Sequence, residues 1–276
     1  MPTKTLFITG VSSGFGHALA CEAIAAGHRV IGTVRNEAAL LAFEAFSKEL
    51  AHGVILDVTD FDRIDTVVAA TEAQHGPVDV LVNNAGYGHE GIFEESSLDE
   101  MRRQFDVNVF GAVAVTKAFL PYLRQRRAGH IINITSMGGT ITLPGIAYYC
   151  GSKFALEGIS DTLSKELIPF NIFVTAVAPG SFRTDWAGRS MQRTPRSIAD
   201  YDASFDPIRQ AREAKSGKQL GDPAKAAQAM LQLIASPHPP AHLLLGSDAL
   251  MLVRDKLEQS ARDIAQWETL TRSTDG

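Results

Sequence analysis

Three side chains in the middle of the sequence could together move a proton to or from a carbonyl oxygen. Tyr149 and Lys153 are four residues apart, and Ser136 precedes the tyrosine by thirteen. A free phenol has a pKa of about 10, so it is a weak acid or base near neutral pH. An ammonium group one helical turn away favours the phenolate and lowers that pKa. We therefore expect Tyr149 to exchange the proton and Ser136 to hold the oxygen.

Tyr148 is a rival for the role of Tyr149. Residues four apart lie on one face of a helix, and only Tyr149 has this spacing from Lys153. The spacing from Ser136 selects the same residue. We expect Tyr148 to be a neighbour that packs or lines the cavity.

The N-terminal region predicts a site for a hydride donor. An apolar run from Lys4 to Thr9 predicts a buried strand, and an alanine-rich stretch from Ala18 to Ala26 predicts a helix. A strand, a glycine-rich turn and a helix in this order place the helix N-terminus against a phosphate, although a simple tight turn is the alternative. The residues expected to contact the nucleotide are Gly10, Ser12, Ser13, Gly14, Phe15 and Gly16.

The end of the second predicted strand indicates which nicotinamide cofactor is used. An NAD site has a carboxylate here for the ribose 2′-hydroxyl. The segment from Thr33 to Asn36 has no acid, and it contains Arg35. A guanidinium suits a 2′-phosphate, so we expect NADP(H) rather than NAD(H). A solvated surface arginine is the alternative.

These residues together resemble the short-chain dehydrogenase/reductase family from about Lys4 to Leu245. The segment from Thr33 to Asn36 and the long segment after Gly180 point to its hydroxysteroid and retinol dehydrogenase-like branch. Matching elements follow the family's order and spacing: the T-G-x-x-x-G-x-G turn at Thr9 to Gly16, Asp57-Val58, Asn83 to Gly86, Asn108, Ser136, Tyr149-x-x-x-Lys153 and Pro179-Gly180.

The resemblance implies a role for each matching position. Tyr149 would be the acid in reduction and the base in oxidation. Lys153 would lower its pKa and hold the nicotinamide ribose, and Asn108 would bind a water that links Lys153 to solvent. Ser136 would orient the substrate oxygen. The implied cofactor contacts are Asp57 and Val58 near the adenine, Asn84, Ala85 and Gly86 near its ribose, Pro179 and Gly180, and Thr184 at the carboxamide.

Three of these elements also have ordinary structural interpretations. Ser136 follows a predicted strand, and serine is common at strand ends. Asparagine and glycine are turn residues, so the segment from Asn83 to Gly86 could simply close a strand. Asn108 lies in an apolar helical stretch, where it could serve only to bond neighbouring groups.

Apolar runs alternate with helical stretches along the chain. This pattern predicts an α/β protein with a single-domain Rossmann fold, a doubly wound parallel sheet of about seven strands with helices on both faces. The ends of the strands then meet at one rim and gather the motifs into a cleft. The predicted strands are Lys4–Thr9, His28–Thr33, Val54–Leu56, Val78–Val82, His130–Thr135, Ile172–Ala178 and His242–Leu245.

Two segments interrupt this pattern within the expected single domain, residues 1–276. Residues 181–220 form a long polar loop, which we interpret as a substrate lid. Its apolar side chains either line a pocket or pack the lid: Trp186, Met191, Tyr201 and Phe205. Residues 249–270 predict an amphipathic helical extension that finishes the core or supports self-association.

Composition restricts the partners. The chain has 276 residues and a net charge of −5, with no basic tract, which argues against nucleic acid. Cys21 and Cys150 are expected to be free thiols in a reducing compartment, the cytoplasm. The histidines show no metal-ligand spacing, and no signal peptide or membrane span is expected. The resemblance implies a homodimer or homotetramer.

The sequence thus predicts an NADP(H)-dependent oxidoreductase that interconverts a carbonyl and an alcohol of a small molecule. One alternative is a catalytically silent NADP(H)-binding regulatory protein of the same fold. The intact set of Tyr149, Lys153, Ser136 and Asn108 argues against it. A methyltransferase with a similar glycine turn would need neither Tyr149 nor Lys153.

Overall fold

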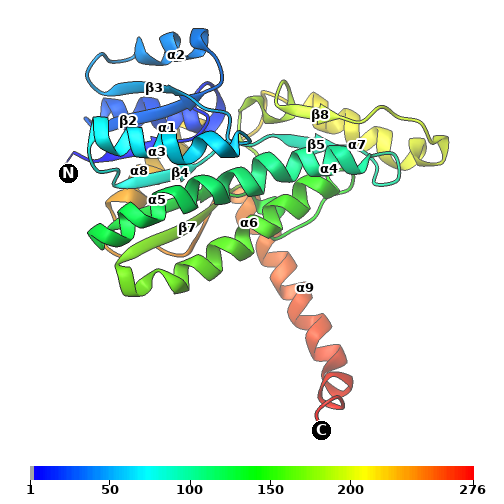
Figure 1. Ribbon diagram of the computed structural model, residues 1–276. Helices are drawn as coiled ribbons and strands as arrows, with labels where there is room; N and C mark the ends of the chain where they lie inside the picture. The colour runs from blue at the N-terminus through cyan, green and yellow to red at the C-terminus, as the bar shows by residue number, and fades with distance from the viewer. Residues whose placement is uncertain (1–2) are drawn as a thin grey trace.

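A seven-stranded parallel sheet with helices on both faces forms the body of the protein (Figure 1). This computed structural model describes residues 3–276. The spatial strand order is β3-β2-β1-β4-β6-β7-β9. The strands are β1 (Thr5–Ile8), β2 (Arg29–Val34), β3 (Ala51–Ile55), β4 (Val80–Asn83), β6 (Gly129–Ile134), β7 (Ile172–Pro179) and β9 (His242–Leu245). The predicted fold class and its seven strands are confirmed.

Successive strand residues enter two separate cores. In β1, Leu6 and Ile8 contribute to one core, whereas Phe7 contributes to the other. Helices cover both faces, so the strands are apolar on both sides, as parallel sheets require. One face is covered by α1 (Gly14–Ala25), α2 (Glu37–Glu44) and α8 (Pro223–Ala235), and the other by α3 (Phe61–His75), α5 (Ala112–Arg126) and α6 (Ala147–Glu166).

A π-helical turn interrupts the helical layer that contains α3, α5 and α6. Helix α4 (Leu98–Phe105) begins at a capping box formed by Ser97 and Glu100. It continues into a π-helical segment, Asp106–Gly111, and then into α5. Such bulges concentrate at functional sites. This one contains Asn108.

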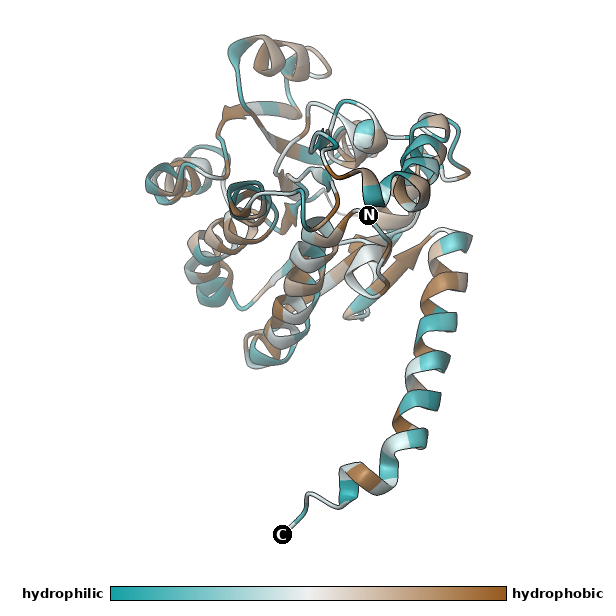
Figure 2. Ribbon diagram, turned by 90° about the vertical axis from the view of Figure 1, so that its right-hand side faces the viewer, coloured by the Kyte–Doolittle hydropathy of each residue, from teal (hydrophilic) through white to brown (hydrophobic). Residues whose placement is uncertain are grey.

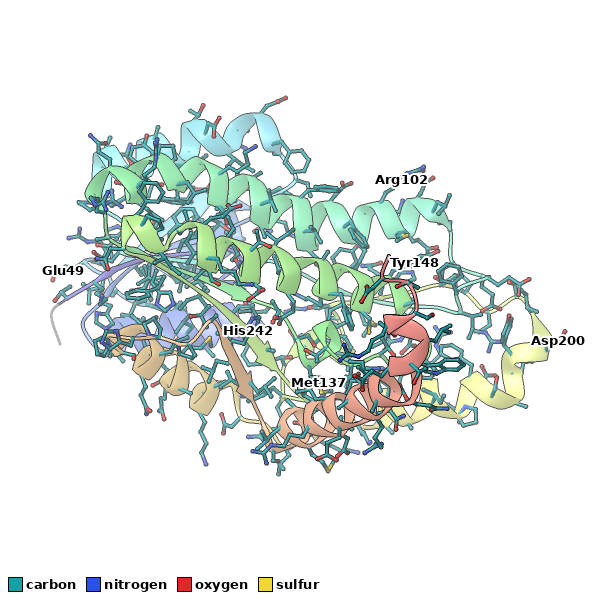
Figure 3. All side chains as sticks on the ribbon, turned by 90° about the horizontal axis from the view of Figure 1, so that it is seen from below. Glu49, Arg102, Met137, Tyr148, Asp200 and His242 are labelled. Atoms are coloured by element: carbon teal, nitrogen blue, oxygen red, sulfur yellow. The ribbon has the colours of Figure 1, made fainter. Side chains whose placement is uncertain are left out.

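The segment 181–220 is more regular than the predicted loop. It contains short 3₁₀ turns, the strand β8 (Met191–Arg193) and helix α7 (Asp202–Ala214). β8 pairs in parallel with β5 (Gly88–Glu90) to form a second, two-stranded sheet. The prediction of a long loop was wrong in this respect. The strand β8 has only three residues, too few to show a periodic pattern, and α7 buries only Phe205, so its apolar face is short. Asp200 lies at the outer end of this segment (Figure 3).

Buried ion pairs join this lid, residues 181–220, to the body. The Glu90 carboxylate is inaccessible to solvent and contacts Arg193 at 3.3 Å, Arg209 at 3.2 Å, and Arg212. Glu95 accepts hydrogen bonds from the backbone N–H groups of Ser197 and Ile198 at 2.6 and 2.7 Å. A buried carboxylate needs such partners, so these contacts hold the lid in place.

The predicted C-terminal extension is helix α9 (Ser247–Arg272), which runs away from the body (Figures 1 and 2). Only Ala249 and Val253 of this helix are buried. Within residues 3–276, no helix combines the length and apolar character needed to cross a membrane.

Candidate functional site

A single cavity of about 1680 Å³ lies along the carboxyl ends of the strands. Asn108 and Gly16, two of the predicted site residues, do not line it. The other predicted residues all do: Gly10, Ser12, Ser13, Gly14, Phe15, Arg35, Asp57, Val58, Asn84, Ala85, Gly86, Ser136, Tyr149, Lys153, Pro179, Gly180 and Thr184. Positions far apart in the sequence thus share one site.

The glycine turn is held by side chains from two neighbouring strands. Gly10 has a φ of 75°, which favours glycine, and its N–H donates to Thr33 Oγ1 at 3.0 Å. Asn84 Nδ2 donates to the carbonyl oxygens of Thr9 and Gly10, both at 2.9 Å. The amide of Asn84 therefore supports the turn, in agreement with its structural interpretation.

Gly16 allows α1 to pack against this turn. A Cβ atom at Gly16 would lie 2.2 Å from the Gly10 carbonyl oxygen and 2.3 Å from Asn84 Nδ2. The Ser13 N-cap makes no side-chain hydrogen bond, and the first turn of α1 contains no acid. The first N–H groups of a helix have no partner within it, so this end of the cavity suits an anion.

Arg35 and Asp57 line the cavity beyond the glycine turn. Asp57 Oδ1 accepts hydrogen bonds from Thr59 N at 2.9 Å and Thr59 Oγ1 at 2.7 Å. Burial opposes ionisation of Asp57, but these hydrogen bonds and the charge of Arg35 outweigh it and lower its pKa. The Arg35 side chain is exposed. Its guanidinium is therefore accessible at the end of the cavity.

Tyr149 and Lys153 lie on the same face of α6, as their spacing predicts. Both side chains are buried, and Lys153 Nζ lies 5.8 Å from the centre of the Tyr149 ring. Nζ donates to the Ile134 carbonyl oxygen at 2.8 Å. Ile134 is the last residue of β6, and Ser136 lies just beyond this strand. The Ser136 Oγ accepts a hydrogen bond from Gly138 N at 3.0 Å. The end of β6 and helix α6 thus bring the three predicted reactive groups to one part of the cavity.

The pKa of Tyr149 differs from the sequence-based expectation. Burial raises it to about 12, although the polar groups of Ser136 and Trp186 nearby favour the ionised form. Burial also lowers the pKa of Lys153 to about 8. We expected Lys153 to lower the phenol pKa, but burial is the largest influence on it, and the Lys153 ammonium donates its hydrogen bond to the Ile134 carbonyl oxygen and not to the phenol. Desolvation therefore outweighs the charge that the spacing suggested.

Asn108 is buried and joins the backbone of Tyr87, which lines the cavity, to helix α6. Its Oδ1 accepts from Tyr87 N, and its Nδ2 donates to the Tyr87 carbonyl oxygen and to Ser152 Oγ, all at 3.1 Å. Ser152 Oγ in turn donates to the Tyr149 carbonyl oxygen at 2.7 Å. The π-helical turn thus couples Asn108 to the helix that carries the tyrosine. Its role in a water relay stays a prediction.

Tyr148 packs outside the cavity. Its hydroxyl donates to the Ser96 carbonyl oxygen at 2.8 Å, and its ring stacks on His89 with centroids 5.0 Å apart. Tyr148 is labelled on α6 in Figure 3. Of its two expected roles, the structure shows packing.

Gly180 and Thr184 line the cavity where the lid segment begins. Thr184 Oγ1 accepts from Trp186 N at 3.4 Å and so begins a 3₁₀ turn. Gly180 N donates to the Leu245 carbonyl oxygen at 2.8 Å. Gly180 is thereby held by its backbone and Thr184 by its side-chain hydroxyl.

Trp186 has a larger part in the site than the sequence indicated. Its ring lies 5.0 Å from that of Tyr149, and it lines the cavity. Its Nε1 is buried and makes no hydrogen bond of regular geometry with any residue in 3–276. The other apolar residues of the lid mainly pack it, since Phe205 and Met191 are buried.

Asp248, at the base of α9, is a site residue that sequence reasoning missed. Its Oδ2 accepts from Ser181 N at 2.8 Å, and a Cβ atom at Gly180 would lie 2.2 Å from its Oδ1. No local pattern marks this aspartate, because its partners lie far away in the sequence.

Cys21 and Cys150 are free thiols. In the described part of the chain, no three His, Cys, Asp or Glu side chains are grouped so that they could hold a metal ion.

Comparisons with known proteins agree with this geometry. The pattern of the short chain dehydrogenases matches residues 4–194. Oxidoreductase BOA17 of Botryotinia fuckeliana is 37% identical over 270 residues, 98% of each chain. Human retinol dehydrogenase 8 is 36% identical over 251 residues, 86% of this chain and 79% of its own. A crystal structure of a short-chain dehydrogenase from Streptomyces avermitilis has a TM-score of 0.93 at 40% identity and 99% coverage of both chains.

Proposed function

The chain belongs to the short-chain dehydrogenase family and is an oxidoreductase acting on CH–OH groups, and from this premise we propose that it interconverts a carbonyl and an alcohol with NADP(H), using Tyr149 as acid and base. One observation carries the proposal. A single cavity is lined both by the glycine turn at the N-terminus of α1 and by Tyr149 with Lys153. A cofactor bound at the turn can therefore extend to the phenol.

The residues present fit a nicotinamide dinucleotide. Gly16 keeps the turn close to α1, and the first N–H groups of that helix suit the pyrophosphate. Asp57 and Val58 would hold the adenine, Lys153 the nicotinamide ribose and Thr184 the carboxamide. Contacts along the same wall would come from Ser12, Ser13, Phe15, Asn84, Ala85, Gly86, Pro179 and Gly180. The bound cofactor supplies or accepts a hydride at the carbonyl carbon.

The side chains supply the proton chemistry. With a pKa of about 12, the Tyr149 phenol is protonated near neutral pH and ready to donate to a carbonyl oxygen. Ser136 Oγ accepts from Gly138 N, so its own proton remains available for that oxygen. The reverse reaction needs the phenolate and is favoured by higher pH. Cells usually keep NADPH reduced, so reduction is the proposed direction.

The surroundings of the phenol favour an apolar group next to the carbonyl. Leu143, Ile146 and Trp186 line the cavity together with Tyr149. One relative is named a retinol dehydrogenase, which is consistent with an apolar alcohol or ketone. The proposed substrate is therefore a small molecule with an apolar body.

The two free cysteines suit a reducing compartment such as the cytoplasm.

The preference for NADP(H) comes from the end of β2. Thr33 Oγ1 accepts a hydrogen bond from Gly10 N in the glycine turn, and Val34 is buried. The next residue, Arg35, is exposed. A guanidinium there binds a 2′-phosphate, whereas no carboxylate is present for a 2′-hydroxyl. Arg35→Ala should weaken NADPH binding by about tenfold or more, which corresponds to one charge-assisted contact, and should change NADH binding little. Calorimetric titration with both cofactors measures this, and equal losses for the two would refute the role.

A substrate panel tests the function itself. Ketones, aldehydes and alcohols are incubated with NADPH, NADP, NADH or NAD, and the nicotinamide absorbance band is followed. The expected result is turnover of at least one carbonyl with NADPH. Stoichiometric NADPH binding without any turnover would favour the silent regulatory protein instead.

A further inference from the structure

Helix α9 leaves the body after its first two turns. Ala249 and Val253 are buried, whereas all residues from Arg254 to the C-terminus are exposed except Ser260, which is half-buried. Figures 1 and 2 show from two directions that most of the helix is separate from the body. Helical stability in proteins comes mainly from the packing of an amphipathic face, and isolated helices are marginal in water. This helix therefore needs something to pack against.

The exposed part of α9 has a regular apolar stripe. Leu257, Ile264 and Trp267 have 59%, 71% and 58% of their surface exposed. The stripe continues the line of Val253, which is buried against the body of the same chain. Its members alternate in steps of three and four residues, the spacing of a coiled-coil seam: Leu250, Val253, Leu257, Ser260, Ile264, Trp267 and Thr271.

We propose that this stripe binds the same stripe of a second copy, so that two α9 helices form an antiparallel coiled coil. In the matching register, Leu257 packs against the partner's Trp267. Ser260 then packs against the partner's Ile264, with the twofold axis near Arg262. In the second of these layers a small side chain faces a large one, which helps the two helices to interdigitate. The proposal does not depend on the reaction, because these side chains lie outside the cavity.

The charges beside the stripe select the antiparallel orientation. Arg254 and Glu268 occupy equivalent flanking positions, which face each other in an antiparallel pair. Arg254 would therefore meet the partner's Glu268, once on each side of the axis. In a parallel pair, Asp263 would face the partner's Glu268 twice, and like charges oppose pairing.

One contact in the antiparallel pair is unfavourable. Asp263 would lie near its own copy at the axis, but its carboxylate already accepts a hydrogen bond from Gln259 Nε2 at 2.7 Å. Two attractive pairs therefore stand against one repulsive contact. Among residues 3–276, Arg254 has no ion-pair partner in its own chain, so it is available to a second copy. Glu268 already contacts Arg272 of its own chain at 2.7 Å and would be shared between Arg272 and the partner's Arg254.

The mass of the full-length protein tests the seam. Sedimentation velocity over a range of concentrations should show a dimer or a larger even assembly. Ile264→Glu places a charge in the seam and should halve the mass, or raise the dissociation constant about tenfold or more. Met251→Glu is the control, since Met251 is 57% exposed and lies on the opposite side of the helix. It should leave the mass unchanged.

A charge exchange tests the orientation. Arg254→Glu and Glu268→Arg should each weaken the assembly, and the double variant should restore it. NADPH binding should change little in every variant, which separates this proposal from that for the site. A monomeric wild-type protein, or an unchanged mass for Ile264→Glu, would overturn the proposal. Failure of the double variant to recover would overturn the antiparallel register.

Discussion

The phenol of Tyr149 and the ammonium of Lys153 share one buried environment, and burial moves both pKa values toward the neutral form. The phenol is raised to about 12 and the ammonium is lowered to about 8. In such an environment a positive charge is costly, so Lys153 takes the Ile134 carbonyl oxygen as its partner. In the proposed reaction the tyrosine would thus donate its proton at neutral pH, and oxidation should accelerate with rising pH.

The single hydroxyl of Tyr149 can be removed with little change in packing. Tyr149→Phe should lower turnover by about 10²- to 10⁴-fold, the usual contribution of a general acid, with NADPH affinity within a few-fold of wild type. Steady-state rates and calorimetric titration measure these effects. Tyr148→Phe is the matched control: it loses the hydrogen bond to Ser96, so about 1 kcal/mol of stability is at risk but turnover is kept. The reverse pattern would assign the chemistry to Tyr148.

At the scale of elements, the strand-turn-helix unit β1-α1 depends on backbone contacts that leave no room for a side chain. The Gly10 carbonyl oxygen and Asn84 Nδ2 both lie within 2.3 Å of where a Cβ atom of Gly16 would be. Asn84 comes from the end of the adjacent strand β4, so the turn is held by the sheet and not by its own sequence alone. Any displacement of α1 would therefore spread to the predicted phosphate site.

Gly16→Ala should destabilise the fold and weaken the cofactor site together. Overpacking of this kind typically costs about 1–3 kcal/mol, and NADPH affinity should fall because the turn and α1 must separate. Urea unfolding and cofactor titration provide the two readouts. Gly158→Ala in α6 is the control, because a Cβ atom there meets nothing within 4 Å. It should stabilise the helix by about 0.5–1 kcal/mol. A Gly16→Ala variant with normal stability would show that the turn adjusts.

At the scale of the whole molecule, the lid is joined to the body by ionised groups as well as by buried apolar side chains such as Phe205 and Met191. Hydrogen bonds from the backbone of Ser197 and Ile198 and the charge of Arg196 lower the pKa of Glu95 to about 2, against the effect of burial. A carboxylate with a depressed pKa stabilises the fold above its ordinary pKa of 4.5 and loses this contribution as the pH falls toward 2. Acid should therefore loosen the lid.

Glu95→Gln should reproduce that loosening at neutral pH. The variant should melt at a lower temperature than wild type at pH 7, and the difference should shrink as the pH is lowered from about 5 to about 3. Its lid should also be cleaved faster in limited proteolysis within residues 195–215. Glu258→Gln, at an exposed position on α9 3.9 Å from Arg262, serves as the control and should change neither result. If the difference in melting temperature between Glu95→Gln and wild type stayed constant with pH, ionised Glu95 would not be what holds the lid.

The sequence by itself determined the parts of this protein that depend on local order. Apolar runs located the seven strands, glycine spacing located the turn, and helical spacing placed Tyr149 and Lys153 on one face of a helix, because each pattern is written within a few neighbouring residues. Only the tertiary structure decided what depends on atoms from distant segments. It showed the partner of Lys153, the direction of the tyrosine pKa shift, the pairing of β5 with β8, and the places of Trp186 and Asp248. Burial and long-range pairing arise when the chain is folded, so no local pattern records them.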